Sequence, residues 1–157
     1  MFLRLLTMQD SEQVFEHLSD ESVTEFMPDI EPCRSIEEAG EIIQFHLNFT
    51  GGRWGLFRKC DHKLLGTCGY HFWTTGLKSE AEIFFDLSKS YWGKGYMREV
   101  LTPVIHFGFT DMEFQLIRAT VDRRNIRCIQ LLRKLGFVRQ EQLEMYLLLF
   151  TLQSPSS

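Results

Sequence analysis

A glycine-containing turn between a predicted strand and a predicted helix has the composition of an anion-binding site. Residues 83–87 form an apolar run typical of a buried strand, and Trp92-Gly93-Lys94-Gly95 precedes a segment whose apolar residues have helical spacing. The first N–H groups of a helix lack intrahelical partners and carry partial positive charge. Glycines let the backbone approach a phosphate closely, and Lys94 adds a cation. The turn is predicted to bind a phosphorylated ligand, although an ordinary tight turn has the same composition.

The turn differs from the two common nucleotide-binding motifs. It has neither the GxxxxGK[ST] spacing of a nucleoside-triphosphate loop nor the GxGxxG of a dinucleotide-binding fold. The class of phosphorylated ligand therefore has to be inferred from the sequence on either side.

That wider sequence resembles motif A of the GNAT acetyltransferases, which bind acetyl-coenzyme A through a Q/R-x-x-G-x-G/A loop. Residues 81–100 read AEIFFDLSKSYWGKGYMREV, with Gly93 and Gly95 at the glycine positions and Ser90 at the first position, where it departs from the family pattern. The Tyr-Trp-Gly-x-Gly-Tyr motif resembles that of the RimJ/RimL-like branch, which acetylates the N-termini of ribosomal proteins. Residues 125–137 resemble motif B of the same family, in the expected order and spacing.

The resemblance implies that acetyl-CoA is the co-substrate and that no metal takes part. Backbone N–H groups of the motif A strand would polarise the thioester carbonyl, and the turn and helix N-terminus would hold the pyrophosphate. The residues that the resemblance assigns to the coenzyme are Phe84, Phe85, Asp86, Leu87, Trp92, Gly93, Lys94, Gly95, Tyr96, Met97, Asn125 and Arg133. Asn125 is equally suited to be an ordinary helix N-cap.

Two residues are predicted to be catalytic, again through the resemblance. Glu82 occupies a position where many family members carry the carboxylate that takes the amine proton, and a surface glutamate is the alternative. Strand alternation places Asp86 on the same nominal face as a second candidate. Many family members use a tyrosine general acid at the position of Leu132, so this role moves to Cys128, whose S–H could donate weakly to the leaving thiolate.

Other roles for the nearby residues stay open. Cys128 could be a small buried hydrophobe, as free cysteines usually are, or could form a covalent acetyl-cysteine intermediate. His71 could lie near the amine or be a half-buried histidine with structural partners only.

The expected reaction is direct acetyl transfer to a primary amine in a ternary complex. A protein N-terminal α-amine, such as that of a ribosomal protein, is the acceptor that the resemblance favours. A small-molecule acceptor (a polyamine, an amino sugar or an antibiotic) is the enzymatic alternative. A coenzyme-A-binding module without turnover is the alternative of another class, and Leu132 and Ser90 keep it open.

Composition restricts the partners. The chain has 157 residues, 44% hydrophobic content and a net charge of −4, which argues for a globular domain and against a general nucleic-acid binder. Four cysteines without metal-ligand spacing, no long apolar run and no signal-peptide pattern lead us to expect a cytoplasmic protein with reduced thiols that does not insert into a membrane.

Charge is distributed unevenly along the chain. Residues 10–41 contain eleven acidic side chains and one basic residue, Arg34, whereas residues 118–139 contain seven basic side chains and one acidic residue, Asp122. Two solvated helix faces would explain this pattern. The functional alternative is an acidic entrance for the amine and a basic flank for the coenzyme phosphates.

The strands and helices that must position the candidate site residues can be predicted from the sequence. They indicate a single α/β (α+β) domain over residues 1–152, with a flexible tail at 153–157. Strands are expected at residues 2–6, 54–59, 64–72, 81–87, 116–121, 137–142 and 145–152. About four helices are expected, starting near Asp10, Ser35, Tyr96 and Asn125, with Pro103 kinking or shortening the third. We expect a GNAT-type mixed, mostly antiparallel sheet of about seven strands, with a splay between its two central parallel strands. The apolar last strand would permit a homodimer.

Overall fold

The computed structural model describes residues 1–28, 30–142 and 144–155. The contacts divide the chain into two compact units: the first comprises Met1–Gly69 and Phe85–Tyr96, and the second comprises Tyr70–Phe84 and Met97–Ser157. The elements in chain order are β1 (Phe2–Leu5), η1 (Met8–Asp10), α1 (Ser11–Leu18), α2 (Glu21–Thr24), α3 (Ile36–Phe49), β2 (Trp54–Phe57), β3 (Leu64–His71), β4 (Glu80–Leu87), η2 (Lys89–Tyr91), α4 (Tyr96–Thr110), β5 (Leu116–Asp122), α5 (Ile126–Lys134), β6 (Val138–Gln142) and β7 (Leu147–Gln153).

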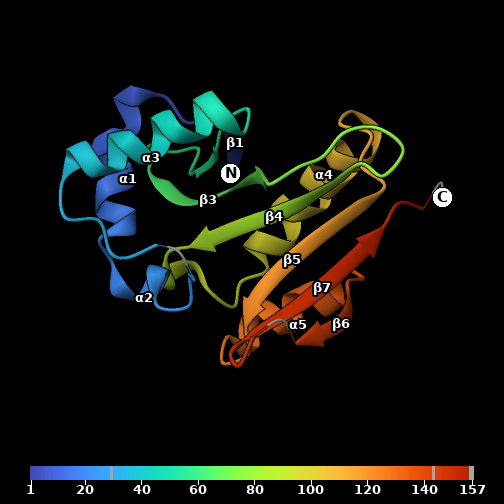
Figure 1. The fold of residues 1–157 in the computed structure, drawn as a ribbon. Helices are drawn as coiled ribbons and strands as arrows, with labels where there is room; N and C mark the ends of the chain where they lie inside the picture. Colours follow the sequence, from blue (N-terminus) through green and yellow to red (C-terminus); the bar gives the residue numbers. More distant parts are fainter. Residues whose placement is uncertain (29, 143, 156–157) are drawn as a thin grey trace. The chain divides into compact units, whose positions relative to one another are not determined.

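The strands form the predicted mixed sheet. Its order is β1-β2-β3-β4-β5-β7-β6, and the pairing of β4 with β5 is parallel (Figure 1). The parallel register begins at Glu80 and Leu116 and, in the part of the chain that the structure describes, ends at Glu82 and Arg118. Both strands continue beyond that point. The predicted parallel central pair is therefore present, and the register described covers only the first residues of the two strands.

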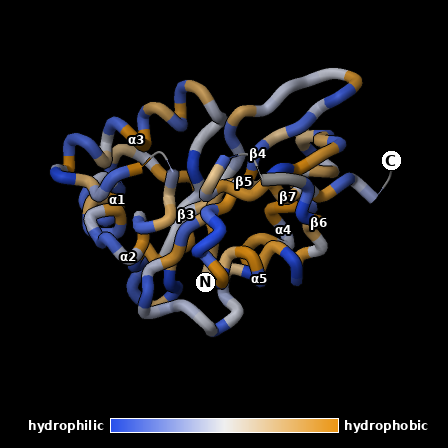
Figure 2. The backbone as a smooth tube through the Cα atoms, turned by 60° about the horizontal axis from the view of Figure 1, so that its bottom comes forward, coloured by the Kyte–Doolittle hydropathy of each residue, from blue (hydrophilic) through white to orange (hydrophobic). Residues whose placement is uncertain are grey.

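In the first unit, helices α1 and α3 pack beside each other over an apolar core (Figure 1). Helix α3 begins at the predicted cap, where the Ser35 hydroxyl accepts from the Glu38 N–H at 3.2 Å. The Glu38 carboxylate accepts from the Arg34 N–H rather than from Ser35. Figure 2 shows hydrophobic and hydrophilic residues alternating along α3, as an amphipathic helix requires. The core residues of this unit are Leu6, Val14, Leu18, Val23, Cys33, Ala39, Ile43, Phe57 and Leu64.

In the second unit, β7 pairs antiparallel with β5 on one side and with β6 on the other. Helix α5 ends at a glycine: Gly136 has a φ of 92°, its N–H donates to the Arg133 carbonyl, and the Phe137 N–H donates to the Leu132 carbonyl. This pair of bonds is a Schellman motif, in which glycine takes the left-handed position at low cost. The order of the chain thus places the motif B helix directly before the strand at the edge of the sheet.

Two helical features differ from the expectation. Helix α4 is not shortened at Pro103, because it continues to Thr110. Because both Pro103 and Glu99 lie on the exposed side of α4, water can satisfy the Glu99 carbonyl that the proline leaves without a helical partner. The single-turn helix α2, capped by Asp20 through the Ser22 N–H, was not predicted because four residues are too few to show a helical period.

The structure describes part of the predicted C-terminal tail. Gln153 belongs to β7, and Ser154 is buried with its N–H donating to the Gln115 carbonyl at 2.9 Å. Ser156 and Ser157, in the predicted flexible tail, and Leu143, in the loop before β7, lie outside the described residues.

Candidate functional site

Strand β4 changes its burial phase between Phe84 and Phe85. Ala81 and Ile83 are buried and alternate with half-buried neighbours, but the next buried residue is Asp86 rather than Phe85. A strand that kept strict alternation would place Asp86 beside Glu82 on one face. The burial pattern thus separates a half-buried carboxylate, Glu82, from a buried one, Asp86.

Glu82 lies where the parallel register ends and remains accessible. Its side chain is 27% exposed, and its Oε1 lies 3.2 Å from Nε2 of His71 on β3, whose side chain is 23% exposed. The His71 ring also contacts the rings of Phe72 and Phe84. The structure thus brings together two groups that can accept a proton, at the end of the second unit's parallel ladder.

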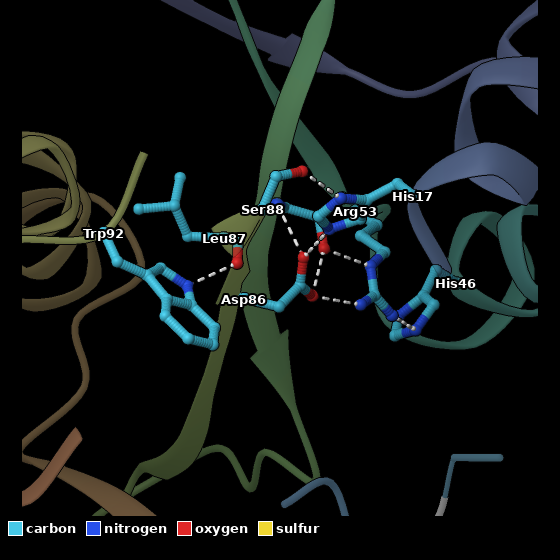
Figure 3. A network of polar contacts seen from close by, with 8 residues as sticks. His17, His46, Arg53, Asp86, Leu87, Ser88 and Trp92 are labelled. Carbon is cyan, nitrogen blue, oxygen red and sulfur yellow. Dashed lines mark hydrogen bonds and ion pairs between the residues drawn. The ribbon is translucent and has the colours of Figure 1, made fainter. Parts of the chain in front are cut away.

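Asp86 is buried in the first unit, and its carboxylate is fully occupied (Figure 3). Its side chain is 2% exposed; Oδ2 accepts from Arg53 Nη2 at 2.7 Å and from the Thr67 hydroxyl at 2.6 Å, while Oδ1 accepts from the Thr67 N–H and His17 Nε2. His17 and Arg53 and these hydrogen bonds hold the pKa of Asp86 well below its usual range, despite the opposing effect of burial. A carboxylate of lowered pKa that already accepts four hydrogen bonds is a poor proton acceptor, so Asp86 is not suited to be the general base.

The approach of β3 to β4 at this point depends on a glycine. A side-chain carbon at Gly66 would lie 2.3 Å from the Asp86 carbonyl oxygen. The sequence patterns did not predict a role for Gly66 or for the partners of Asp86, namely His17, Arg53 and Thr67. The available signal was a set of charged residues within apolar segments, which by itself does not say which of them pair.

The glycine turn follows β4 within the first unit and is held at several points before its glycines. The indole N–H of Trp92 donates to the Leu87 carbonyl at 2.8 Å, and Arg58 donates to the Tyr91 hydroxyl at 3.0 Å. Gly93 and Gly95 have φ values of 73° and 79°, and the space where their side chains would lie is open. The glycines are therefore required by backbone conformation and leave room for a ligand close to the main chain.

In the second unit, the first turn of α5 carries Asn125 and Cys128. The Asn125 side chain accepts from the Cys128 N–H at 3.2 Å, so it is the helix N-cap. Cys128 is half-buried, and burial raises the pKa of its thiol to about 12. A thiol of this pKa is almost entirely protonated at neutral pH, which disfavours it as a nucleophile.

Arg133 lies on the side of α5 that faces a cavity of about 330 Å³ within the second unit. Arg123 and Arg139 also line this cavity, together with Ile129 and Leu148. The basic segment predicted from the sequence therefore converges in part on one hollow.

The acidic segment is less uniform than its composition suggests. Asp10 is buried, accepts from both terminal nitrogens of Arg4 at 2.8 Å and caps the Thr7 N–H. This ion pair and the Thr7 hydrogen bonds lower the pKa of Asp10 although burial opposes them. Asp10 is therefore part of the fold, and Asp29 lies outside the described residues.

A sequence comparison decides the family. The family model of the acetyltransferase (GNAT) domain matches residues 1–138. The chain belongs to the GNAT acetyltransferases. This N-acetyltransferase is 32% identical over 151 residues to the uncharacterised N-acetyltransferase YoaA of Bacillus subtilis, covering 94% of this chain and 84% of that protein. Enzymes of the family use acetyl-CoA.

Solved structures share the fold of this acetyltransferase. Spermidine N-acetyltransferase from Vibrio cholerae, in complex with CoA and spermine, has a TM-score of 0.84 at 18% identity, with 97% of this chain and 94% of that chain covered. The ribosomal-protein-S5-alanine acetyltransferase from Vibrio fischeri has a TM-score of 0.77 at 20% identity, with 98% and 92% covered. At these identities the likeness concerns the fold, and the acceptor is a separate question.

The described residues of the acetyltransferase contain neither a candidate membrane-spanning helix nor a candidate metal site. Within residues 1–28, 30–142 and 144–155, no helix is long and apolar enough to cross a membrane. In the same residues, no group of three or more His, Cys, Asp or Glu side chains is arranged to hold a metal ion.

Proposed function

We propose that this acetyltransferase transfers the acetyl group of acetyl-CoA to the α-amine at a protein N-terminus, by direct attack in a ternary complex. The observation that carries the proposal is the pair formed by Glu82 and His71 at the end of the parallel ladder. The pair supplies a proton acceptor beside strand backbone that can bind a thioester substrate.

The residues of the chain fit the coenzyme. The open space at Gly93 and Gly95 gives a diphosphate access to the main chain ahead of α4, whose first N–H groups favour an anion. In the second unit, Ile83 and Phe84 continue β4 past the end of the ladder. The backbone of a strand that continues past its ladder is suited to pair with the amides of a pantetheine arm.

The acceptor class follows from the strength of base that the site offers. An α-amine has a pKa of about 7.7–8.0, so about a third of it is neutral near pH 7.5, whereas a lysine amine of pKa about 10.4 is neutral to about one part in a thousand. A half-exposed carboxylate, alone or through water, can take the proton from such an amine during attack. Glu82, oriented by His71, is the proposed base.

Cys128 is proposed as a hydrogen-bond donor rather than a general acid. Its thiol pKa of about 12 lies above that of an ordinary thiol, about 8.5, so proton transfer from Cys128 to the leaving thiolate would be uphill. The raised pKa also argues against an acetyl-cysteine intermediate. A donated S–H bond to the leaving sulfur needs no proton transfer.

The test measures thiol release from acetyl-CoA at pH 7.5 with matched acceptors. One peptide has a free α-amine and an internal lysine, a second is the same peptide with its α-amine blocked, and spermidine and an amino sugar complete the panel. We expect kcat/KM for the free peptide to exceed that for the blocked peptide at least about tenfold, and mass spectrometry to place the acetyl group on the α-amine.

The other outcomes separate the alternatives. Turnover with spermidine or the amino sugar but not with the free peptide would replace the proposal with a small-molecule acetyltransferase. Binding of CoA without turnover of any acceptor would indicate a coenzyme-binding module. If the free peptide is acetylated, a comparison of protein N-termini in cells with and without the enzyme would identify the protein acceptor, including any ribosomal protein.

Two further parts of the proposal concern the cellular context. The described cysteines, Cys33, Cys60, Cys68 and Cys128, are free thiols, which supports a reducing, cytoplasmic location. The apolar last strand, β7, pairs with β5 and β6 on its two sides, so it is not the edge strand that the expected homodimer required. A homodimer through β6, an edge strand of the sheet, is proposed instead. Sedimentation at several concentrations tests this assembly.

A further inference from the structure

Two buried histidines of the first unit have closely matched surroundings. Nδ1 of His17 lies 2.9 Å from the Ser88 hydroxyl, and its Nε2 contacts the Asp86 carboxylate. Nδ1 of His46 lies 3.0 Å from the Thr50 hydroxyl. Both histidines are about 5% exposed. Each ring therefore bridges a hydroxyl and a charged group inside the protein.

The second charged group is Arg53, whose Nη1 lies 3.1 Å from Nε2 of His46 (Figure 3). A guanidinium group only donates, so this nitrogen of His46 accepts and its Nδ1 carries the proton. His17 is arranged the other way, because its Nε2 faces a carboxylate and has to donate. One histidine thus completes the hydrogen bonds of Arg53, and the other connects Asp86 to the residue that follows β4.

That residue, Ser88, lies in a segment between Asp86 and Gly93 that several hydrogen bonds hold in place. Its N–H donates to the Leu65 carbonyl at 2.8 Å, and its carbonyl accepts from Tyr91 in the η2 turn. Leu87 accepts from the Trp92 indole, so the segment between Asp86 and Gly93 has polar contacts on both sides of Ser88 (Figure 3). The two ring nitrogens of His46 bond instead to Thr50 and Arg53, which are not part of this segment.

We propose that His17 is a positioning residue for coenzyme A: through Asp86 and Ser88 it holds the end of β4 and the entry to the glycine turn in the conformation that binds the diphosphate. A turn that is ordered before binding loses less conformational freedom when the ligand arrives. If the entry to the turn is released, only a fraction of the molecules is competent to bind, and the apparent affinity falls by that fraction. The inference rests on the proposed function only in assigning coenzyme A to the glycine turn.

The experiment measures CoA binding by calorimetry without any acceptor, in the wild type and in His17→Gln, Ser88→Ala and His46→Gln. We expect Kd to rise about five- to tenfold in His17→Gln and Ser88→Ala, the size of one lost hydrogen bond. We expect His46→Gln to lower the melting temperature as much as His17→Gln but to leave Kd within about twofold of the wild type.

Kinetics and a conservative variant separate positioning from general damage. KM for acetyl-CoA should rise in His17→Gln and Ser88→Ala in proportion to Kd while kcat at saturation is retained, and Ser88→Thr, which keeps the hydroxyl, should restore the wild-type Kd. If His17→Gln does not fold, the Ser88→Ala and Ser88→Thr pair decides the question.

Three results would overturn the inference. They are an unchanged Kd in Ser88→Ala, an equal loss of affinity in His17→Gln and His46→Gln, and a fall in kcat with KM unchanged. A wild-type protein that does not bind CoA would overturn both this inference and the coenzyme assignment. A wild-type protein that binds CoA but acetylates no peptide would remove the proposed acceptor and leave the role of His17 intact.

Discussion

Strand β4 carries two carboxylates four residues apart in opposite environments. Asp86 is buried, accepts four hydrogen bonds and pairs with Arg53 and His17, whereas the Glu82 side chain is 27% exposed and contacts His71. The first arrangement fixes a conformation, and the second leaves a group that can exchange a proton with a substrate. Because their burial and partners differ, Asp86 is suited to stabilise the fold, whereas Glu82 is suited to the proton transfer that we propose for it.

The largest expected effect tests the structural carboxylate. Asp86→Ala leaves Arg53 and His17 without their buried partner and should lower the free energy of unfolding by about 3–5 kcal/mol. Glu82→Ala should change it by no more than about 0.5 kcal/mol, as is usual for an accessible side chain. Urea denaturation followed by tryptophan fluorescence measures both values. Equal losses in the two variants would show that the contrast between these carboxylates is not real.

The second prediction concerns the role of Glu82 in catalysis. Glu82→Gln keeps the shape of the side chain but removes the proton acceptor, so kcat should fall at least about a hundredfold with little change in stability. Glu80→Gln is the matched control, because Glu80 lies two residues earlier on β4 and pairs with Arg118 at 2.9 Å. Initial rates with a saturating peptide acceptor measure the effect. A fall of the same size in Glu80→Gln would mean that the charge of the strand matters rather than the base.

Acid should act on the structural carboxylate. Since the pKa of Asp86 is lowered in the folded protein, the unfolded chain binds a proton at higher pH than the folded one. The stabilisation by Asp86 is complete above its unfolded pKa of about 3.9 and is lost as the pH falls below it. Unfolding measured between pH 6 and pH 3 should show a steeper loss in the wild type than in Asp86→Asn. Parallel curves would contradict the assignment of the lowered pKa to Asp86.

A pair of glycines sharpens the comparison between the ligand turn and ordinary helix termination. Gly95 and Gly136 have φ values of 79° and 92°, so alanine at either position should cost about 1 kcal/mol or more of stability. Only Gly95→Ala should also weaken CoA binding, because Gly136 ends α5 in a Schellman motif. Calorimetry with CoA and thermal unfolding measure the two effects. Equal CoA affinity in both variants would remove the turn from the binding site.

The smallest expected effect is at Cys128. Cys128→Ala removes a weak donor whose thiol pKa is raised to about 12, so kcat should fall by less than about tenfold. Cys128→Ser keeps a donor and should fall less than the alanine variant. A loss of a hundredfold or more in Cys128→Ala would instead give this residue the general-acid role. Initial rates at saturating acetyl-CoA distinguish these results.

The sequence determined the strands, the longer helices and the short motifs at their ends. Period-two and helical apolar patterns gave all seven strands and the longer helices, because these patterns report which face of an element is buried. Local capping chemistry did the same for Ser35, Asn125 and Gly136, each of which needs only neighbours within a few residues. The two GNAT motifs then predicted the family that the domain comparison shows.

Only the tertiary structure decided which polar residues meet. The contacts of Asp86 with His17 and Arg53 join residues separated by 69 and 33 positions, and no local pattern predicts such a pairing. The change in burial pattern at Phe84 and Phe85 likewise depends on the surroundings of the strand, so alternation along β4 did not predict that Asp86 is buried. The physical reason is that burial and ion pairing are properties of the three-dimensional environment, which short-range periodicity does not encode.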